Sequence, residues 1–313
     1  MSLHVVIGAG TVGSSLASVL ADQGHGVRVV TRSGRGPSAP GIELVRADAA
    51  DPDALRPHVV GAETLYNCAN PPSYPYWAKV WPPLAASVLA TAEATGAALA
   101  IMGNLYGYGP VAEPMTRDHQ LVATSRKGRL RSQIWHDALA AHSAGRVRVT
   151  EARASDFIGP GIAPTNGYIS RYTRAALAGK TVHAFGDPDA PHSWTYVADV
   201  ARTLAALGTD ERAFGQAWHV PTNPPLSVRQ VVTSMAALAG APVPRVRGVQ
   251  RSILRLTYPF SALLREIDEV LYQHDRPFEI DATVTTSTFG IEATPWDRVL
   301  RETLASLRAE SVG

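Results

Sequence analysis

The stretch from Leu3 to Leu16 constrains the fold of this chain more than any other part of it. A short run rich in β-branched residues leads directly into three glycines with the spacing G-x-G-x-x-G, and then into a segment with apolar residues at helical spacing. Gly8 lets the chain turn tightly, Gly10 lets backbone N–H groups approach a pyrophosphate, and Gly13 lets the helix pack closely against the strand. The stretch therefore predicts a strand, a turn and a helix that together bind a dinucleotide.

The first residues of this predicted helix, Thr11 and Val12, belong to the same expected site. Their backbone N–H groups have no partner inside the helix, and the helix dipole adds partial positive charge at this end. An anionic diphosphate is therefore expected at the helix N-terminus.

The residues after the second predicted strand bear on which dinucleotide is bound. That strand is expected over residues 26–30, and Arg32, Ser33 and Arg35 follow it without a carboxylate among them. An NAD-selective site usually places Asp or Glu here for the ribose 2′-hydroxyl, whereas Arg favours the 2′-phosphate of NADP. We therefore expect NADP(H) rather than NAD(H). The alternative is that both arginines are solvated loop charges.

Further apolar runs alternate with helical segments, and strands are predicted at 42–46, 64–69 and 98–102. This alternation predicts an α/β fold of Rossmann type, a doubly wound parallel sheet whose ligand crevice lies at the C-terminal ends of the strands. Four residues on that rim are expected to contact the cofactor, namely Asp48, Ala49, Ala69 and Asn70. Asp48 has an equal alternative as the N-cap of the helix predicted to follow it.

The length of the chain, 313 residues, suits one such domain with a smaller unit appended. Residues 1–158 are expected to form the dinucleotide-binding domain, with 182–220 contributing further strands and a helix. Residues 159–181 and 221–313 are expected to form a small C-terminal substrate-binding lobe.

Charge and composition limit the partners. The formal net charge of +2 gives no general field for nucleic acid, so small molecules are the expected partners. A single cysteine, Cys68, cannot form an internal disulfide and is interpreted as a small apolar residue. No stretch has the apolar length of a membrane span, and we expect a soluble cytoplasmic protein, possibly a homodimer.

Several motifs, in order and spacing, resemble one known family. They are GAGTVG at 8–13, the strand-end Asp48, YGYGP at 106–110, RASDFIGPG at 153–161 and HSWTYVADV at 192–200. The chain is similar to the short-chain dehydrogenase/reductase superfamily, in its extended NAD-dependent epimerase/dehydratase branch or the atypical relatives of that branch. The resemblance implies a Rossmann domain, a nicotinamide dinucleotide and a C-terminal lobe that closes over the nicotinamide.

The chain departs from this family in its expected catalytic residues. Family members use a Tyr, a Lys four residues later and a Ser, but no Tyr stands four residues before any Lys here. Matching the Tyr-Gly of the family places Asn104 at the Ser position, with Lys127 and Arg131 as replacements for Tyr and Lys. A register two residues earlier, with Ser125 and Arg129, is the alternative.

This altered set still suggests roles. Asn104 would polarise a carbonyl oxygen, and Arg131 would anchor ribose or phosphate oxygens. Lys127, crowded by cations and partly desolvated beside the nicotinamide, would act as a general acid with a lowered pKa and would also contact the cofactor. Tyr106 or Tyr108 would supply a phenol instead. The competing interpretation of the basic segment is a solvated helix face.

Aromatic residues suggest an apolar substrate pocket, and core packing is the alternative for each of them. The expected lining residues are Tyr74, Trp77, Phe157, Tyr168 and Trp194. The ten histidines show no metal-ligand spacing, so no metal site is expected. His192 is interpreted as an exposed loop residue, and a catalytic role is the alternative.

Three functions fit these observations. The first is an NADP(H)-dependent oxidoreductase of atypical short-chain type, acting on a carbonyl, enone or alcohol of a hydrophobic metabolite. The second is a redox-neutral epimerase, isomerase or cyclase that keeps its nucleotide bound. The third is a non-catalytic NADP sensor resembling the NmrA-like regulators.

Overall fold

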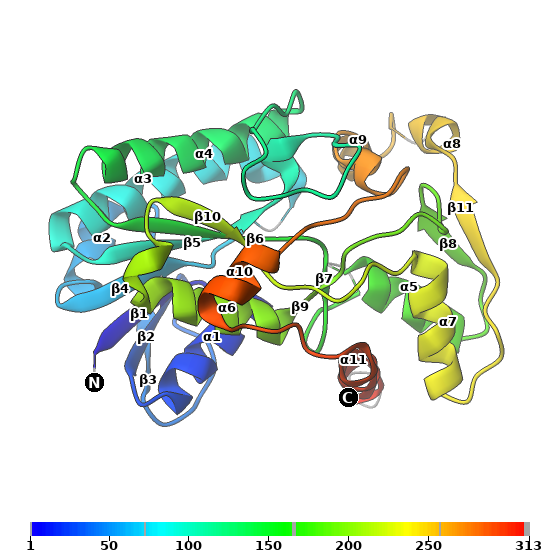
Figure 1. The fold of residues 1–313 in the computed structure, drawn as a ribbon, viewed down its shortest axis with the longest axis horizontal. Helices are drawn as coiled ribbons and strands as arrows, with labels where there is room; N and C mark the ends of the chain where they lie inside the picture. Colours follow the sequence, from blue (N-terminus) through cyan, green and yellow to red (C-terminus); the bar gives the residue numbers. More distant parts are fainter. Residues whose placement is uncertain (1, 72, 165–166, 257, 310–313) are drawn as a thin grey trace.

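The computed structural model describes residues 2–71, 73–164, 167–256 and 258–309. Its largest element is a parallel sheet of seven strands in the order β10-β6-β5-β4-β1-β2-β3 (Figure 1). The strands are β1 (Leu3–Ile7), β2 (Gly26–Thr31), β3 (Ile42–Arg46), β4 (Ala62–Asn67), β5 (Ala98–Asn104), β6 (Val149–Ala154) and β10 (Gln216–His219). The predicted doubly wound parallel sheet of Rossmann type is confirmed, and its strand order reverses beside β1.

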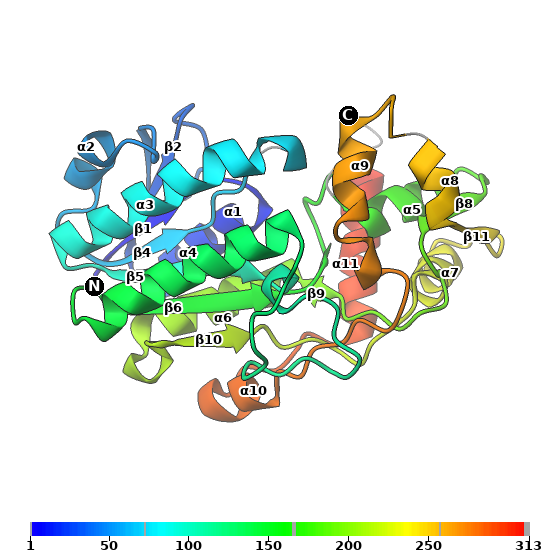
Figure 2. The same ribbon diagram turned by 90° about the horizontal axis from the view of Figure 1, so that it is seen from above.

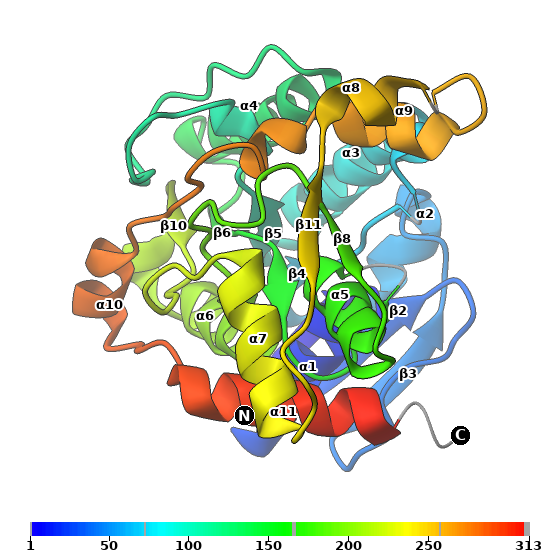
Figure 3. The same ribbon diagram turned by 90° about the vertical axis from the view of Figure 1, so that its right-hand side faces the viewer.

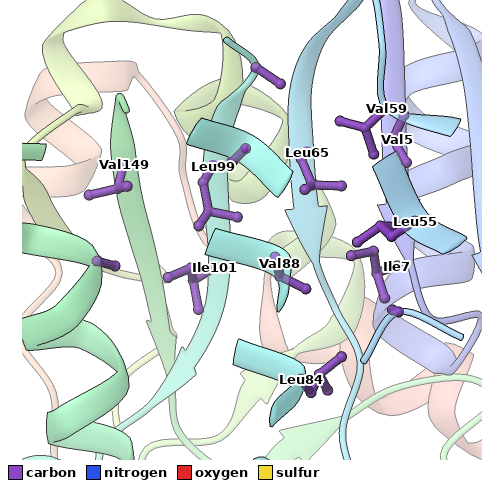
Figure 4. Close-up of a cluster of buried hydrophobic side chains, with 14 of the residues drawn as sticks. Val5, Ile7, Leu55, Val59, Leu65, Leu84, Val88, Leu99, Ile101 and Val149 are labelled. Carbon is purple, nitrogen blue, oxygen red and sulfur yellow. The ribbon is translucent and has the colours of Figure 1, made fainter. Parts of the chain in front are cut away.

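Helices cover both faces of this sheet. The helices α3 (Trp77–Thr95) and α4 (Arg126–Ser143) lie on one face with the short α2 (Pro52–Leu55), and α1 (Thr11–Asp22) and α6 (Val197–Thr209) lie on the other (Figure 1). The first core contains side chains of alternate strand residues packed against α3 and α4, and Figure 4 labels ten of its members. The intervening strand residues face α1 and α6 and form a second core. The strands are therefore buried on both faces, as parallel strands are.

The helix predicted to follow Asp48 is short. It is α2, which ends at Leu55, and a 3₁₀ turn, η1 (Arg56–His58), follows it. Pro57 has no backbone N–H to continue the α-helical hydrogen bonding, which accounts for the change.

The second unit is smaller and contains α5 (Tyr168–Leu177), α7 (Val228–Leu238), α11 (Trp296–Ala309) and a two-stranded sheet of β8 (Val182–Phe185) and β11 (Val246–Val249). Figure 3 faces these elements, which share their own hydrophobic core. We call this unit the lobe, and the seven-stranded sheet with its helices the Rossmann domain. Residues 182–220 divide between the two. The strand β10 joins the large sheet as expected, whereas β8 pairs with β11 in the lobe.

Short elements connect these two units. They are β7 (Phe157–Ile158), which pairs with β9 (Thr195–Tyr196), the helices α8 (Arg251–Leu256), α9 (Ala262–Asp268) and α10 (Thr283–Phe289), and the 3₁₀ turns η2 (Tyr74–Tyr76), η3 (Tyr106–Tyr108), η4 (Glu211–Ala213) and η5 (Leu271–Gln273). In Figure 2, α9 lies between the Rossmann domain and the outer elements of the lobe. Within the described ranges, no helix has both the length and the apolar character needed to cross a bilayer.

Candidate functional site

The three glycines of the first turn have different surroundings. Gly8 has φ +93°, and a Cβ there would lie 3.0 Å from the Cα of Ala69. A Cβ on Gly13 would lie 2.0 Å from the carbonyl oxygen of Gly8, so this close approach of helix to strand requires glycine. A Cβ on Gly10 would have nothing within 4 Å. The first and third glycines therefore shape the turn, and the second faces open space.

The N-terminus of α1 presents backbone donors toward that space. Its N-cap, Gly10, supplies no side-chain acceptor, and the first turn carries no acidic residue. The side chain of Val12 is buried in the core, and Oγ1 of Thr11 donates to the carbonyl of Gly161, 2.9 Å away. What these residues offer an anion is thus their backbone N–H groups, which fits a diphosphate.

A cavity of about 620 Å³ lies beside this turn at the end of β2. It is lined by Ala9, Ser14, Thr31, Ser33, Arg35, Gly36 and Pro37, and none of these described residues carries a carboxylate. Oγ of Ser33 accepts a hydrogen bond from the backbone N–H of Arg35, and Oγ1 of Thr31 donates to its carbonyl, so the turn is held by its own polar groups. Arg32 is exposed beside the cavity.

The rim residues divide into exposed and packed groups. Asp48 is exposed and accepts a hydrogen bond from the N–H of Ala50, whereas Asp51 caps α2. The capping alternative for Asp48 is therefore wrong, and its contact with the cofactor stays a prediction. Ala49 is buried in the core next to α2, so its side chain has little surface to offer a ligand.

The end of β4 lies directly against the glycine turn. Ala69 packs on Gly8 and donates its N–H to Oδ1 of Asn67, 3.3 Å away. Asn70 is exposed and its side chain donates to the carbonyl of Pro71. Both rim residues therefore border the open side of the turn.

The surroundings of Lys127 differ from the expected cationic cluster. Its side chain is only 3% exposed, and Nζ contacts Glu266 at 2.5 Å and Glu269 at 3.3 Å. Both carboxylates also bind Arg126, and Nζ lies 5.1 Å from the ring centre of Tyr74. The expectation of crowding by cations is wrong because α9 brings two carboxylates to this site. The ion pairs join α4 to α9, and a role for Lys127 in proton transfer or cofactor contact stays a prediction.

Arg131, one turn further along α4, is also buried. One guanidinium nitrogen donates to the carbonyl of Met102 at 2.6 Å, and the group lies 4.6 Å from the ring centre of Trp81. Burial lowers the pKa of this guanidinium below its usual range. Nε is buried and has no hydrogen-bond partner among the described residues, and the expected role of Arg131 as an anchor for ribose or phosphate stays a prediction.

Tyr108 belongs to an interior network and cannot supply the expected phenol. It is fully buried, its hydroxyl contacts Nε2 of His219 at 2.8 Å, and Arg153 donates to the same oxygen at 2.8 Å. Arg153 in turn pairs with the buried Glu151. The catalytic expectation for Tyr108 is wrong because the 3₁₀ turn after β5 directs this side chain into the core.

The neighbouring Tyr106 has a different environment, at the C-terminal edge of β5. Its hydroxyl lies 2.6 Å from that of Tyr74, and its ring stacks on Trp77. Oδ1 of Asn104 accepts a hydrogen bond from the backbone N–H of Tyr106. This contact fixes the orientation of the side-chain amide, whose NH₂ group can act as a donor. Burial raises the pKa of both phenols above the usual range, so both are uncharged at neutral pH.

The expected substrate-lining aromatics do not share one surface. Trp77 is 5% exposed in the core of the Rossmann domain, and Trp194 is 2% exposed in the core of the lobe, where its indole N–H donates to the carbonyl of Leu226. The expectation that these two tryptophans line a pocket is wrong, because packing consumes their surface. Phe157 is half-buried against the second core. Tyr74 and Tyr168 are half-buried, and their proximity raises the pKa of Tyr168 in addition to the effect of burial.

Sequence reasoning missed a cluster of Asp156, His192 and His274. His192 is 3% exposed and His274 is 7% exposed, so the interpretation of His192 as an exposed loop residue is wrong. One ligand atom from each residue lies within 4.8 Å of the others. Burial lowers the pKa of His274 to about 4, and Asp156 partly opposes this effect. Burial raises the pKa of Asp156, but the two histidines outweigh it and hold the value below the usual range.

The comparisons with known proteins agree with this fold and glycine turn. The model of the NAD dependent epimerase/dehydratase family matches residues 4–220. The chain therefore belongs to this family, and the resemblance inferred from its motifs is confirmed. It is a nicotinamide-dinucleotide-dependent enzyme, an oxidoreductase or epimerase in the broad sense.

Solved structures with the same fold cover nearly the whole chain. UDP-glucose 4-epimerase from Thermotoga maritima, with UDP-glucose, has a TM-score of 0.81 and 18% identity over 99% of this chain and 100% of its own. dTDP-glucose 4,6-dehydratase from Bacillus anthracis, in complex with NAD, has a TM-score of 0.82 and 17% identity over 100% and 98%. UDP-glucuronic acid 4-epimerase from Bacillus cereus, in complex with NAD, has a TM-score of 0.80 and 15% identity over 98% and 99%. No curated protein sequence matches the chain.

Proposed function

We propose that this protein is an NADP(H)-dependent oxidoreductase of atypical short-chain type that acts on a carbonyl, enone or alcohol of a hydrophobic small metabolite. The observation that carries the proposal is the pairing of two sites on one sheet edge. An open glycine turn stands at the end of β1, and an uncharged pair of phenols, Tyr74 and Tyr106, stands beside the end of β5. In a parallel sheet these strand ends border the same crevice.

The described residues fit a dinucleotide. Backbone N–H groups at Gly10 to Gly13 would hold the diphosphate, and the cavity at the end of β2 would receive the adenine ribose. Arg35 lines that cavity and Arg32 flanks it, which supports binding of a 2′-phosphate. When bound, the nicotinamide gives or takes the hydride.

The residues of the chain then polarise the substrate oxygen and supply a proton. The amide of Asn104 is oriented by its acceptance of the Tyr106 N–H, so its NH₂ group is available to an oxygen. Tyr106 would donate to the same oxygen, and the hydroxyl of Tyr74, 2.6 Å away, would replace the proton. Because burial raises the pKa of both phenols, they stay protonated at neutral pH and can donate a hydrogen bond to a substrate oxygen.

The surroundings of these phenols support an apolar substrate. Tyr168 and Tyr272 lie close enough to influence the pKa of Tyr106. Such aromatic surfaces with few polar groups are typical of sites for hydrophobic small molecules.

A second candidate is a redox-neutral epimerase, isomerase or cyclase that retains its nucleotide. Membership in the epimerase/dehydratase family favours it, as do the sugar epimerases among the structural neighbours. The two candidates differ in whether the nucleotide must leave after each turnover.

Native mass spectrometry of the purified protein, followed by addition of NADPH or NADH, tests both candidates. The reductase predicts an empty or exchangeable site that binds NADPH at least tenfold more tightly than NADH. Replacement of Arg32 and Arg35 by Ala should remove that preference and leave NADH binding unchanged. Gly10→Ala should weaken the binding of both NADPH and NADH. Retained nucleotide that does not exchange would favour the redox-neutral enzyme. Failure to bind either nucleotide would refute the proposed function.

A carbonyl panel monitored by NADPH absorbance tests the assignment of the phenols. Once a substrate is found, Tyr106→Phe should lower kcat by about 10²-fold or more, the range for loss of a general acid. Tyr108→Phe is the matched control, because its hydroxyl lies in the interior network. Equal losses in both variants would contradict the assignment of Tyr106.

A further inference from the structure

Three segments that are distant in the sequence meet at Asp156, His192 and His274. Asp156 lies between β6 and β7, His192 follows β8, and His274 follows η5. The imidazole rings are nearly parallel, with an interplanar angle of 8° and centres 5.1 Å apart. Nε2 of His192 lies 3.1 Å from Oδ2 of Asp156, and Nε2 of His274 lies 3.5 Å from the same oxygen. Both rings therefore present the same nitrogen to one carboxylate oxygen.

The hydrogen bonding of His192 leaves a lone pair at this point. Its Nδ1 lies 3.1 Å from the carbonyl oxygen of Gln273, which can only accept, so Nδ1 carries the proton. In that tautomer the lone pair of Nε2 points toward Asp156, and the hydroxyl of Ser155 lies 3.4 Å from the same nitrogen. Oδ2 of Asp156 is buried and makes no hydrogen bond of acceptable geometry among the described residues. Either a proton or a metal ion can lie between a buried carboxylate oxygen and an imidazole nitrogen so arranged.

We propose that Asp156, His192 and His274 bind a divalent transition-metal ion through one carboxylate oxygen and two Nε2 atoms. Zinc ligands of these types lie about 2.0–2.2 Å from the metal, which in a tetrahedron separates neighbouring ligand atoms by about 3.3–3.6 Å. The separations from Oδ2 are 3.1 and 3.5 Å, close to that range, and all three ligand atoms lie within 4.8 Å of one another.

The residues around the ligands have the form expected of such a site. A metal-binding histidine usually donates its other ring N–H to a carboxylate or backbone carbonyl, as His192 does to Gln273. His274 packs edge-on against Tyr168, with ring centres 4.6 Å apart, and His192 packs on Phe278. Imidazole and carboxylate ligands suit zinc, iron, cobalt or nickel rather than calcium. Three protein ligands leave a position for water or a substrate oxygen.

Titration of the chelator-treated, full-length protein with Zn²⁺ alone tests the proposal. Calorimetry should find one strong site per chain, and Zn²⁺ should raise the unfolding temperature. Each of the variants Asp156→Asn, His192→Gln and His274→Gln should lower the affinity for Zn²⁺ by about 100-fold. Changes to residues that only support metal ligands already lower metal affinity by about 10–100-fold. His136→Gln, at an exposed histidine of α4, is the matched control and should bind Zn²⁺ as the wild type does.

Co²⁺ provides a second measurement that needs no variant. The wild-type protein with Co²⁺ should show the visible absorption of a site with nitrogen and oxygen ligands, and added Zn²⁺ should abolish it. The proposal is overturned if the wild type shows neither strong Zn²⁺ binding nor this absorption. It is also overturned if folded variants of the three residues bind Zn²⁺ as tightly as His136→Gln. No nucleotide is added, so the result is independent of the proposed oxidoreductase activity.

Discussion

Replacement of Lys127 by Met is expected to separate α9 from α4. The Lys127 side chain is 3% exposed and that of Glu266 is 12% exposed, so their contact is a buried ion pair. Removing one member of such a pair destabilises by about 3–5 kcal/mol, because the other charge stays buried without its partner. Arg126 would still neutralise Glu266 and Glu269, but its side chain is 65% exposed, and exposed pairs contribute about 0–1 kcal/mol. We therefore expect a net loss of about 3 kcal/mol in the stability of this contact.

Hydrogen exchange and urea unfolding measure this loss at two scales. Exchange should accelerate in α9 and at the N-terminal end of α4, because local opening there becomes easier. Glu266→Gln combined with Lys127→Met should show a coupling energy of about 1–3 kcal/mol, the usual range for residues in contact. The control is Arg301→Met on α11, whose pair with Asp297 has side chains 60% and 62% exposed and should lose less than about 1 kcal/mol.

Two results would refute this reasoning. If Lys127→Met were no more destabilising than Arg301→Met, the buried contact between α4 and α9 would not stabilise the protein. If Lys127→Met and Glu266→Gln were strictly additive, the two side chains would not interact. Unchanged exchange in α9 would lead to the same conclusion.

Three further perturbations have effects that follow from single contacts. Gly13→Ala should lower the free energy of unfolding by about 1–3 kcal/mol, the usual cost of overpacking, because the new Cβ would lie 2.0 Å from a backbone oxygen. Equal thermal stability of Gly13→Ala and Gly10→Ala would contradict this prediction. Burial lowers the pKa of His219 to about 4 from 6.5, so the unfolded chain binds the extra proton between these values. Stability from this residue is complete above pH 6.5 and is lost as the pH falls toward 4, by at most about 3 kcal/mol. His219→Gln should flatten that part of the pH profile, and an unchanged acid limb would refute the assignment. Burial also raises the pKa of the Cys68 thiol to about 12. A disulfide reagent at pH 8 should therefore label Cys68 about 10³-fold more slowly in the folded than in the unfolded protein, because less of the thiol is ionised. Equal labelling rates in the two states would contradict this pKa shift.

The location of the dinucleotide turn and the class of the fold were predictable from the sequence because their signals are local. The turn at Gly8 to Gly13 depends on glycine spacing within a few residues, and five strands of the large sheet are visible as short apolar runs. The strands β6 and β10 contain polar residues and give no such run. Parallel pairing then follows from the alternation of strands and helices. The position of β8 was not predictable in this way, because an apolar run does not say which sheet it joins.

The site required the tertiary structure because its residues come from distant segments. Nothing near Lys127 in the sequence indicates that Glu266 on α9 and Glu269, directly after that helix, will contact it. The cations next to Lys127 in the sequence predicted the opposite environment. Tyr106 and Tyr108 stand two residues apart, yet one reaches the hydroxyl of Tyr74 and the other is buried in the core. The 3₁₀ turn η3 points these two side chains in different directions, and which direction each takes depends on tertiary packing.

The same distinction applies to the protein as a whole. The sequence by itself determined the class of the sheet and the strand, turn and helix at its first βα unit, since local periodicity and glycine spacing control these features. Only the tertiary structure decided that His192 and His274 meet Asp156, because the three segments come together only when the lobe packs against the Rossmann domain. A metal-ligand motif can be recognised in a sequence only when its residues are close together in the chain. Asp156, His192 and His274 are far apart in the sequence, so no such motif marks them.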